Sequence, residues 1–522
     1  MTEGAVTEPA PVAPPLGRRS PRQVDRYHDD LVVVAIFVAA QILFIAVLGV
    51  RMDLLFLTFA PHVPDLGLLQ HHLLQTVFYE HTQPPGFPFL VGALLQASPF
   101  PDGITFQVVW LGFGLATAVV LRRIGRMMGL GRVATFVAIA LVVTNPALVS
   151  IEFSANYDQP TILLLALLVL FIGRYVSSGS TRHLAAITGI GAAMVLIRTV
   201  FHPAWYLLLL AGLATMRQPS WRGRRVLVAL VLPGLAIAAF VLKNDVLYGE
   251  ANLTSWGGPS LSKIAGSAAR PAERDRLIAD GTVSPLFGRP VFIVGYDKYA
   301  DAVPPCRPAH PDVPVLADPY RPSAPSFDPS GKGSPNLNYE CFLPVYRRQG
   351  RDAIAYMRKE PGKFFGAQFT GVQFFFEPAL PIVFTPHNLR ALHGADTAYS
   401  WTLFPRVLLK PAAHSEWGGL RDLVNGGIYL LPTIVLLDLA AVALAVPAIR
   451  RLIRQRRRTG GGRRRRGLAA QAAIGLTCGW VTVIGSAFEI NENARYRLLI
   501  EPFLLLILAW AGEVVWRAVN RR

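Results

Sequence analysis

Long apolar runs alternate with short charged connections along most of this chain. A helix needs about 20 mainly apolar residues to cross the hydrocarbon layer of a bilayer. The pattern therefore predicts an all-α polytopic membrane protein with about ten transmembrane helices. The runs, of which 201–216 is the weakest, cover residues 31–50, 104–121, 133–150, 159–176, 183–199, 201–216, 226–243, 427–449, 468–488 and 498–516.

Arginine is distributed unevenly between the connections. Alternate connections, counted with the two termini, hold 27 of the Arg residues, whereas the short loops on the opposite side hold 4. Cytoplasmic loops retain positive charge. We therefore expect both termini in the cytoplasm and the protein in the plasma membrane. The four Arg residues on the opposite, exoplasmic side are Arg51, Arg198, Arg495 and Arg497.

The connections also predict how the chain is divided. One apolar run in the first loop, 85–100, is short and bounded by prolines, so we expect a juxtamembrane helix there. Residues 303–337 are rich in Pro, Gly and Ser, which predicts irregular structure, whereas 344–376 is helical and aromatic in pattern and fits a membrane surface. The expected parts are a disordered cytoplasmic tail (1–30), an N-terminal transmembrane domain (31–243) with a first exoplasmic loop (51–103), a large exoplasmic segment of mixed, irregular structure (244–425), and a C-terminal transmembrane hairpin region (426–522) with a basic cytoplasmic loop (450–467).

Composition supports the membrane assignment. The chain is 52% hydrophobic and 16% charged, and its mean hydropathy is +0.39, which a soluble globular protein could not sustain without large exposed apolar patches. The net charge is +18, and the basic residues lie between apolar runs, where they determine the orientation of the spans. The expected partner is therefore the lipid bilayer and not nucleic acid. Cys306, Cys341 and Cys478 show no metal-ligand spacing. A disulfide between the first two fits an oxidising exterior, and Cys478 fits a small core residue.

Ionisable and polar side chains collect at the exoplasmic ends of the predicted spans. Such groups at membrane depth are costly, so they are functional candidates by default. Each also has a structural alternative, such as capping a helix or pairing with a neighbour. The candidates discussed below are Asp53, Glu80, His81, Gln83, Tyr157, Asp158, Arg198, His202, Glu489, Glu492, Arg495, Tyr496 and Arg497.

The first loop supplies candidate catalytic residues. Asp53 directly follows the first span and could act as a general base or simply cap a helix end. Asp65 fits the N-cap of an amphipathic helix. Glu80, His81 and Gln83 form a polar cluster immediately before two prolines.

The later loops supply candidate binding residues. Tyr157 and Asp158 begin a span, and Arg198 and His202 end another. A desolvated Arg suits a phosphate group, and the alternative for Arg198 is an ion pair with Asp158 or Glu152. In the last loop, Arg495 and Arg497 fit an anionic lipid phosphate or pair with the glutamates around them. The remaining candidates of that loop are Glu489, Glu492 and Tyr496.

The order of these features resembles the GT-C glycosyltransferases, and within them the branch of the protein O-mannosyltransferases and lipid A aminoarabinose transferases. The shared pattern is an interfacial acid after the first span, a polar-Pro-Pro motif about 30 residues on, a span opening with Tyr-Asp-x-Pro, a large late exoplasmic segment and a terminal Arg-Tyr-Arg loop. The resemblance implies transfer of a sugar from a polyprenyl-phosphate donor to an envelope glycan, lipid or protein acceptor.

The resemblance also implies residue roles. Asp53 matches the catalytic acid of the first loop, and His81 and Gln83 stand near a position that often carries His or Lys before Pro-Pro. The donor phosphate would be held by Arg198, Arg495 and Arg497. The chain departs from the family pattern at two positions. Leu54 follows Asp53 where many members have a second acid, so whether the protein uses a divalent metal is left open. Gln83 stands where Lys or His is common. No other cofactor is implied.

Two other functions remain as alternatives. A transporter or flippase of a lipid-linked saccharide needs polar residues along a path through the bilayer, whereas the predicted spans are nearly free of charge and show no repeat. A non-catalytic envelope scaffold would use the large segment to bind a partner. An enzyme predicts that Asp53, His81, Asp158 and Arg495 line one cavity.

Overall fold

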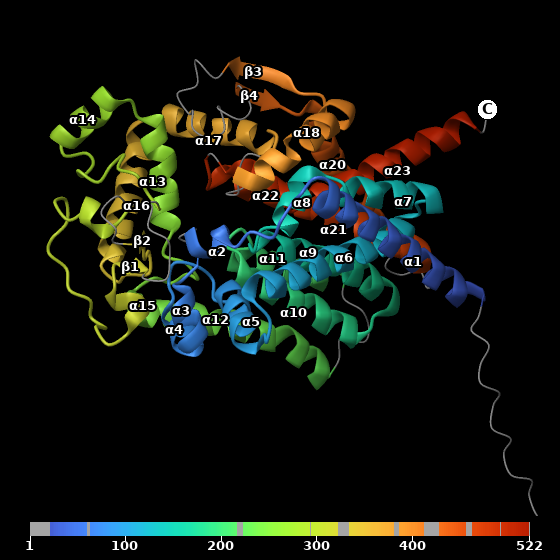
Figure 1. Cartoon of the computed structure of the whole chain (residues 1–522), viewed down its shortest axis with the longest axis horizontal. Helices are drawn as coiled ribbons and strands as arrows, with labels where there is room; N and C mark the ends of the chain where they lie inside the picture. Colours follow the sequence, from blue (N-terminus) through green and yellow to red (C-terminus); the bar gives the residue numbers. More distant parts are fainter. Residues whose placement is uncertain are drawn as a thin grey trace, which may run out of the picture.

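The computed structural model describes residues 21–59, 63–216, 223–292, 294–321, 333–379, 386–411, 427–455, 462–490 and 492–520. Helices form a bundle on one side and a smaller lobe on the other, and α1 and the C-terminus lie at the end of the bundle far from the lobe (Figure 1). The described residues contain two antiparallel strand pairs, β1 (Tyr320–Arg321) with β2 (Ser334–Pro335) and β3 (Val407–Pro411) with β4 (Gly427–Leu430). The predicted all-α class is confirmed.

Seven helices in the described part of the chain are long and apolar enough to cross a membrane, and an eighth span would be a bent pair. The pair is α7 (Arg132–Val143) and α8 (Pro146–Glu152), which meet at 62° because Asn145 caps α8 and Pro146 begins it. A multi-pass membrane protein is therefore confirmed. The seven are α1 (Pro21–Ile42) continued by η1 (Leu43–Val47), α6 (Asp102–Met128), α9 (Asp158–Ser178), α12 (Arg224–Tyr248), α20 (Pro432–Arg454), α21 (Gly462–Ala487) and α23 (Glu501–Val519).

Three apolar helices are shorter than a full span. They are α5 (Gly86–Ala97), α10 (Thr181–Ile197) and α11 (Pro203–Thr215), with 12, 17 and 13 residues. At 1.5 Å per residue, α11 covers only about 20 Å of a hydrocarbon layer about 30 Å thick. The first matches the expected juxtamembrane helix. The other two occupy predicted spans, so the count of ten spans stays a prediction.

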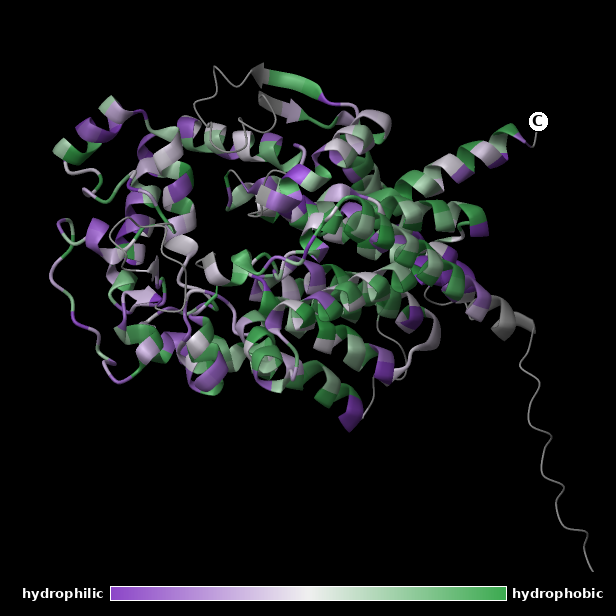
Figure 2. Cartoon of the chain, in the orientation of Figure 1, coloured by the Kyte–Doolittle hydropathy of each residue, from purple (hydrophilic) through white to green (hydrophobic). Residues whose placement is uncertain are grey.

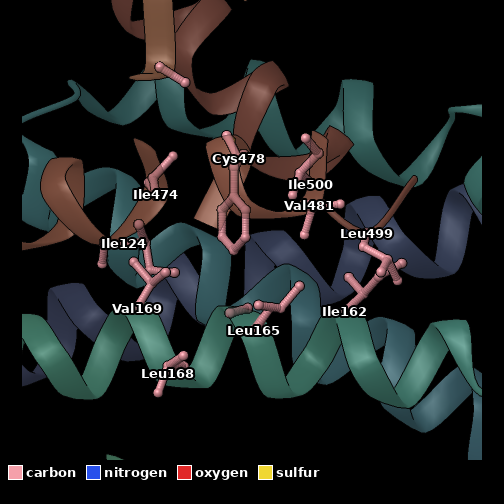
Figure 3. Packing of buried hydrophobic residues seen from close by; sticks show 14 of the residues in the cluster. Ile124, Ile162, Leu165, Leu168, Val169, Ile474, Cys478, Val481, Leu499 and Ile500 are labelled. Carbon is pink, nitrogen blue, oxygen red and sulfur yellow. The ribbon is translucent and has the colours of Figure 1, made fainter. Parts of the chain in front are cut away.

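The bundle core is built from aliphatic side chains of central helices. Ile124 of α6, Leu165 of α9, and Ile474 and Cys478 of α21 belong to one cluster of buried side chains (Figure 3). The backbones of α20 and α21 approach each other closely at Gly475. A Cβ atom at this position would lie only 2.2 Å from the Ala441 carbonyl oxygen, so no side chain fits there. Apolar residues cover the outer surface of the bundle, as a lipid-facing surface requires (Figure 2).

Buried polar pairs interrupt this interior at a few positions, although the candidate spans remain mostly free of charge. Asp438 and Glu501 lie within predicted spans, where the surrounding residues keep the average apolar. Each acid has a hydrogen-bond donor, which lowers the cost of burial. The pairs are Gln41 with Glu152 (2.8 Å), Asn145 with Glu501 (2.6 Å) and Thr482 with Asp438 (3.0 Å).

Two predicted boundaries are wrong. Helix α1 begins at Pro21, inside the expected disordered tail, where Asp29 and Asp30 form ion pairs with Arg132 (2.7 Å) and Arg122 (2.6 Å). Residues 1–20 lie outside the described ranges. At the other boundary, α12 continues to Tyr248, beyond the start at 244 of the predicted outer segment.

The lobe consists of α13 to α16 with β1 and β2 (Figure 1). As expected, the described part of 303–337 is mostly irregular. The helical pattern of 344–376 forms two helices, broken at Glu360 and Pro361, and only the second exposes aromatic side chains, Phe365 and Phe369. Lobe helices are α13 (Gly257–Ala268), α14 (Pro271–Ala279), α15 (Pro314–Ala317) and α16 (Phe342–Lys359); α17 (Pro361–Phe375) follows.

Short helices complete the chain around the junction of bundle and lobe. The first loop forms α2 (Leu55–Phe59), α3 (Leu66–His71) and α4 (Leu73–Tyr79), and Asp65 caps α3 by accepting hydrogen bonds from two backbone N–H groups. Cys306 and Cys341 form a disulfide with a Cα–Cα distance of 5.7 Å. The other elements are η2 (Tyr296–Lys298), α18 (Pro386–Leu403) and α22 (Asn493–Leu498).

Candidate functional site

A cavity of about 590 Å³ lies where the bundle meets the lobe. Its walls come from chain segments far apart in sequence: the start of α9, the turn between α10 and α11, the end of α21 with α22, and the loop that leads into α13. Eight candidate residues line it: Gln83, Tyr157, Arg198, His202, Glu489, Glu492, Arg495 and Tyr496. The ends of several helices therefore bring together side chains that the sequence scatters over more than 400 residues.

One buried carboxylate holds two arginines that line this cavity. Asp158 is fully buried in the first turn of α9 and forms ion pairs with Arg198 and with Arg495 Nε, the latter at 2.6 Å. The helix N-terminus also favours negative charge at Asp158. The pairing of Arg198 with Asp158 is thus present, while Glu152, the other suggested partner, binds Gln41.

The two guanidinium groups retain buried N–H groups that no described residue accepts. These are Nε of Arg198 and Nη2 of Arg495. Aromatic rings cover the guanidinium faces: the Tyr157 ring centre lies 4.5 Å from Cζ of Arg198 and 4.9 Å from Cζ of Arg495. Phe56 of α2 lies 4.9 Å from Arg495 on another side. The faces are covered, and the N–H groups without an acceptor are buried beside the cavity that both arginines line. Guanidinium N–H groups of this kind suit an anion.

A second charged group closes the side of the cavity next to the lobe. Lys263 of α13 forms an ion pair with Glu489, and Arg495 lies 3.5 Å from Glu492. Burial alone would lower the pKa of Lys263, but the two nearby glutamates outweigh it and raise the pKa, so Lys263 stays charged. Burial raises the pKa of Glu489, with Lys263 opposing and Glu492 adding to the rise. The last loop is thereby tied to the lobe.

Apolar side chains also line the cavity. Trp480 and Ile484 of α21 line it with Phe488, which follows the helix, and Trp480 Nε1 donates a hydrogen bond to the Val200 carbonyl at 2.8 Å. On the lobe side, Trp256 packs on Phe292 with ring centres 4.6 Å apart. The cavity lining is therefore amphipathic, with charged and large apolar side chains.

Asp53 does not line the cavity. Its backbone N–H donates to the Phe153 carbonyl at 2.9 Å, and its carboxylate accepts the Leu55 N–H at 2.6 Å at the start of α2. Half-burial raises the pKa of Asp53, against the effect of the Leu55 hydrogen bond. The capping alternative thus describes its contacts, although Phe56, three residues later, reaches Arg495.

Glu80 and His81 also lie outside the cavity lining. His81 is fully buried, with its ring nitrogens 2.8 Å from Ser255 Oγ and 3.0 Å from the Asn338 carbonyl oxygen. Burial lowers the pKa of His81 to about 3 and raises that of Glu80 well above its usual value. The Glu80 carbonyl accepts a hydrogen bond from Lys243 Nζ at 2.7 Å. Both residues attach the first loop to other parts of the protein, which brings Gln83 to the cavity.

The two arginines of the last loop point to different places. Residues two apart on a helix face opposite sides, and both lie on α22. Arg495 lines the cavity, whereas Arg497 is buried in the bundle with its Nη2 3.4 Å from Glu501. The structure therefore does not bring Arg497 to the cavity.

Several lining residues carried no distinctive signal in the sequence. Lys263 belongs to the basic residues of a long outer segment, and Trp480 belongs to an apolar span. Neutral polar residues of the loop before α13 and of α13 itself complete the wall: Asn252, Thr254 and Ser260. His202 lines the cavity as the N-cap of α11, with Nδ1 accepting the Ala204 N–H at 3.2 Å.

Within the described ranges, no group of three or more His, Cys, Asp or Glu side chains is placed to hold a metal ion. The cavity lining contains cationic, acidic, aromatic and neutral polar groups. Comparison of the chain with protein family models, with curated proteins and with solved structures finds no match.

Proposed function

We propose that this protein is a membrane glycosyltransferase of the GT-C type. It takes a sugar from a polyprenyl-phosphate donor and transfers it to a cell-envelope acceptor on the exoplasmic side of the plasma membrane. In this proposal both termini are cytoplasmic, which fits the arginine bias of the connections. It also fits the position of the start of α1 and the end of α23 on the side of the bundle far from the lobe (Figure 1).

The observation that carries the proposal is a pair of arginines that line the cavity and keep buried N–H groups with no acceptor among the described residues. Arg198 and Arg495 are 3% and 6% exposed, and each keeps an N–H group without an acceptor. Leaving a buried donor unpaired costs about 1–3 kcal/mol, so a bound phosphate oxygen recovers that free energy. The apolar side chains of the lining, such as Trp480, accommodate the first isoprene units of a lipid.

The same N–H groups suit the chemistry of the transfer. The bond between C1 of the sugar and the phosphate oxygen breaks, and C1 forms a bond to the acceptor oxygen or nitrogen. The leaving polyprenyl phosphate then gains negative charge, which Arg198 and Arg495 stabilise without reorganising. The acceptor proton passes to a carboxylate. Glu489 and Glu492 line the cavity, and Asp53 is the base that the family resemblance suggests.

The test is sugar transfer by the full-length protein in nanodiscs. A panel of polyprenyl-phosphate sugars is supplied with envelope extract as acceptor, and the released polyprenyl phosphate is measured. Arg495→Lys keeps the positive charge but loses the planar donor edge, so transfer should fall about 100-fold, as for loss of one preorganised donor. Asp53→Asn, Glu489→Gln and Glu492→Gln identify the base by loss of transfer with the donor still bound.

Arg497→Lys is the matched control because Arg497 is also buried beside a carboxylate in the same loop but lies outside the cavity lining. It should retain transfer close to that of the unmodified protein. The proposal is wrong if the Arg495 and Arg497 variants lose transfer equally, or if no polyprenyl-phosphate sugar is bound or consumed.

A further inference from the structure

Helix α16 carries a stripe of positive charge on its exposed side. All five of its basic residues are exposed, at spacings that place them along one face of the helix. At 1.5 Å per residue the stripe is about 18 Å long. Its members, here called the α16 stripe, are Arg347, Arg348, Arg351, Arg358 and Lys359.

Most of this charge is not neutralised within the protein. Arg347 pairs with Glu250 at 2.8 Å, and Arg348 lies 3.4 Å from Asp352, which itself accepts hydrogen bonds from Ser284. The remaining three members form no hydrogen bond or ion pair with any described residue. They are Arg351, Arg358 and Lys359.

The stripe faces away from the cavity. The opposite face of α16 packs against α13, where a Cβ on Gly258 would lie 2.2 Å from the Tyr346 carbonyl oxygen. On α13, Ser260 and Lys263 point to the other side and line the cavity. Helix α13 therefore lies between the α16 stripe and the cavity, and the stripe covers the outer surface of the lobe.

We infer that the α16 stripe binds a polyanionic polymer, such as an envelope glycan that carries phosphodiester or carboxylate groups. Five cations spread over about 18 Å, three of them without an ion-pair partner among the described residues, match the repeated charges of an extended chain better than a single small anion. A polymer held here lies on the same lobe that closes the cavity. This inference concerns binding alone and does not depend on the proposed transfer.

Anionic lipid headgroups are the competing partner, and the composition of α16 argues against them. A helix that lies in a membrane surface buries an exposed apolar face among the lipids. The apolar face of α16 is already buried in the lobe, and Ile354, at 38% exposed, is its only large hydrophobic residue on the surface. Phe365 and Phe369 of α17, at 57% and 64%, show what a lipid-facing helix exposes instead.

The test measures binding of polyphosphate and of alginate to the full-length protein in nanodiscs of neutral lipid. The two probes separate phosphate from carboxylate recognition. Reversing three charges, in Arg351→Glu with Arg358→Glu and Lys359→Glu, should weaken binding about 100-fold, since each contact is worth about 1 kcal/mol. The loss should shrink at high salt, where binding by the unmodified protein weakens too.

The matched control reverses three other exposed cations, Lys298, Arg307 and Arg390, and should bind within about twofold of the unmodified protein. A second variant replaces Arg351, Arg358 and Lys359 with Gln, and circular dichroism checks that both sets fold. Equal affinity of the stripe and control variants overturns the inference. The inference is also overturned if the protein binds vesicles of anionic lipid more tightly than either polymer and the stripe variant abolishes that binding.

Discussion

Replacing Asp158 with Asn removes the charge that two buried guanidinium groups share. The side chain keeps its size, so the change isolates electrostatics. Removing one partner of a buried ion pair costs about 3–5 kcal/mol, because the other charge is left without compensation. Here Arg198 and Arg495 both lose their carboxylate, and both are nearly fully buried. We expect the free energy of unfolding to fall by about 3–5 kcal/mol.

The assay is unfolding in mixed micelles of dodecyl maltoside and dodecyl sulfate, followed by tryptophan fluorescence. Asp438→Asn is the matched control, because Asp438 is equally buried but accepts a hydrogen bond from Thr482 (3.0 Å) that Asn can also accept, so about 1 kcal/mol or less should be lost. Polyprenyl phosphate should stabilise the Asp158→Asn variant more than the unmodified protein, since the free guanidinium charge attracts the phosphate more strongly. Equal losses for both variants would refute the reasoning.

Three further predictions concern the lobe and its attachment. Reducing the bond between Cys306 and Cys341, which are 35 residues apart, should cost about 3–4 kcal/mol and speed limited proteolysis of the lobe. Gly258→Ala, which forces a contact 2.2 Å from a carbonyl oxygen, should destabilise the lobe by about 1–3 kcal/mol in the same proteolysis assay, whereas Gly257→Ala points into open space and should not. Burial lowers the pKa of His81 to about 3 in the folded protein, against 6.5 in the unfolded chain. The free energy of unfolding should therefore fall as the pH drops below 6.5, by about 2–3 kcal/mol at about pH 4.5. His81→Gln should remove this pH dependence in unfolding measurements.

The helices and the gathering of polar groups could be predicted because both depend on local pattern. Apolar runs of span length form helices in the bundle, and alternate helix ends must lie on the same side of a membrane. Tyr157, Arg198 and Arg495 lie at such ends and line one cavity. Of the four side chains expected to line it together, only Arg495 does, because Asp53, His81 and Asp158 are not among the lining residues. Even so, the sequence could not separate Arg495 from Arg497, because their directions depend on the short helix α22.

The residues that contact His81 could not be predicted because they are remote in sequence. Its ring nitrogens contact Ser255 and Asn338, 174 and 257 residues away, so its burial follows from how the lobe folds onto the first loop. The position of Lys263 in the site could not be predicted for a similar reason, because it lies beside Glu489 only when α13 packs against the bundle. Span length in α10 and α11 likewise depends on turns that average hydropathy does not detect.

The most direct test of a lipid-phosphate site at Arg198 and Arg495 is photo-crosslinking with a polyprenyl phosphate that carries a diazirine in its first isoprene units. The account predicts labelling of peptides that contain Trp480, Ile484 or Phe488, competed by unlabelled polyprenyl phosphate and greatly reduced by Arg495→Lys. Labelling confined to the outer surface of the bundle, with no competition and no effect of that variant, would contradict it.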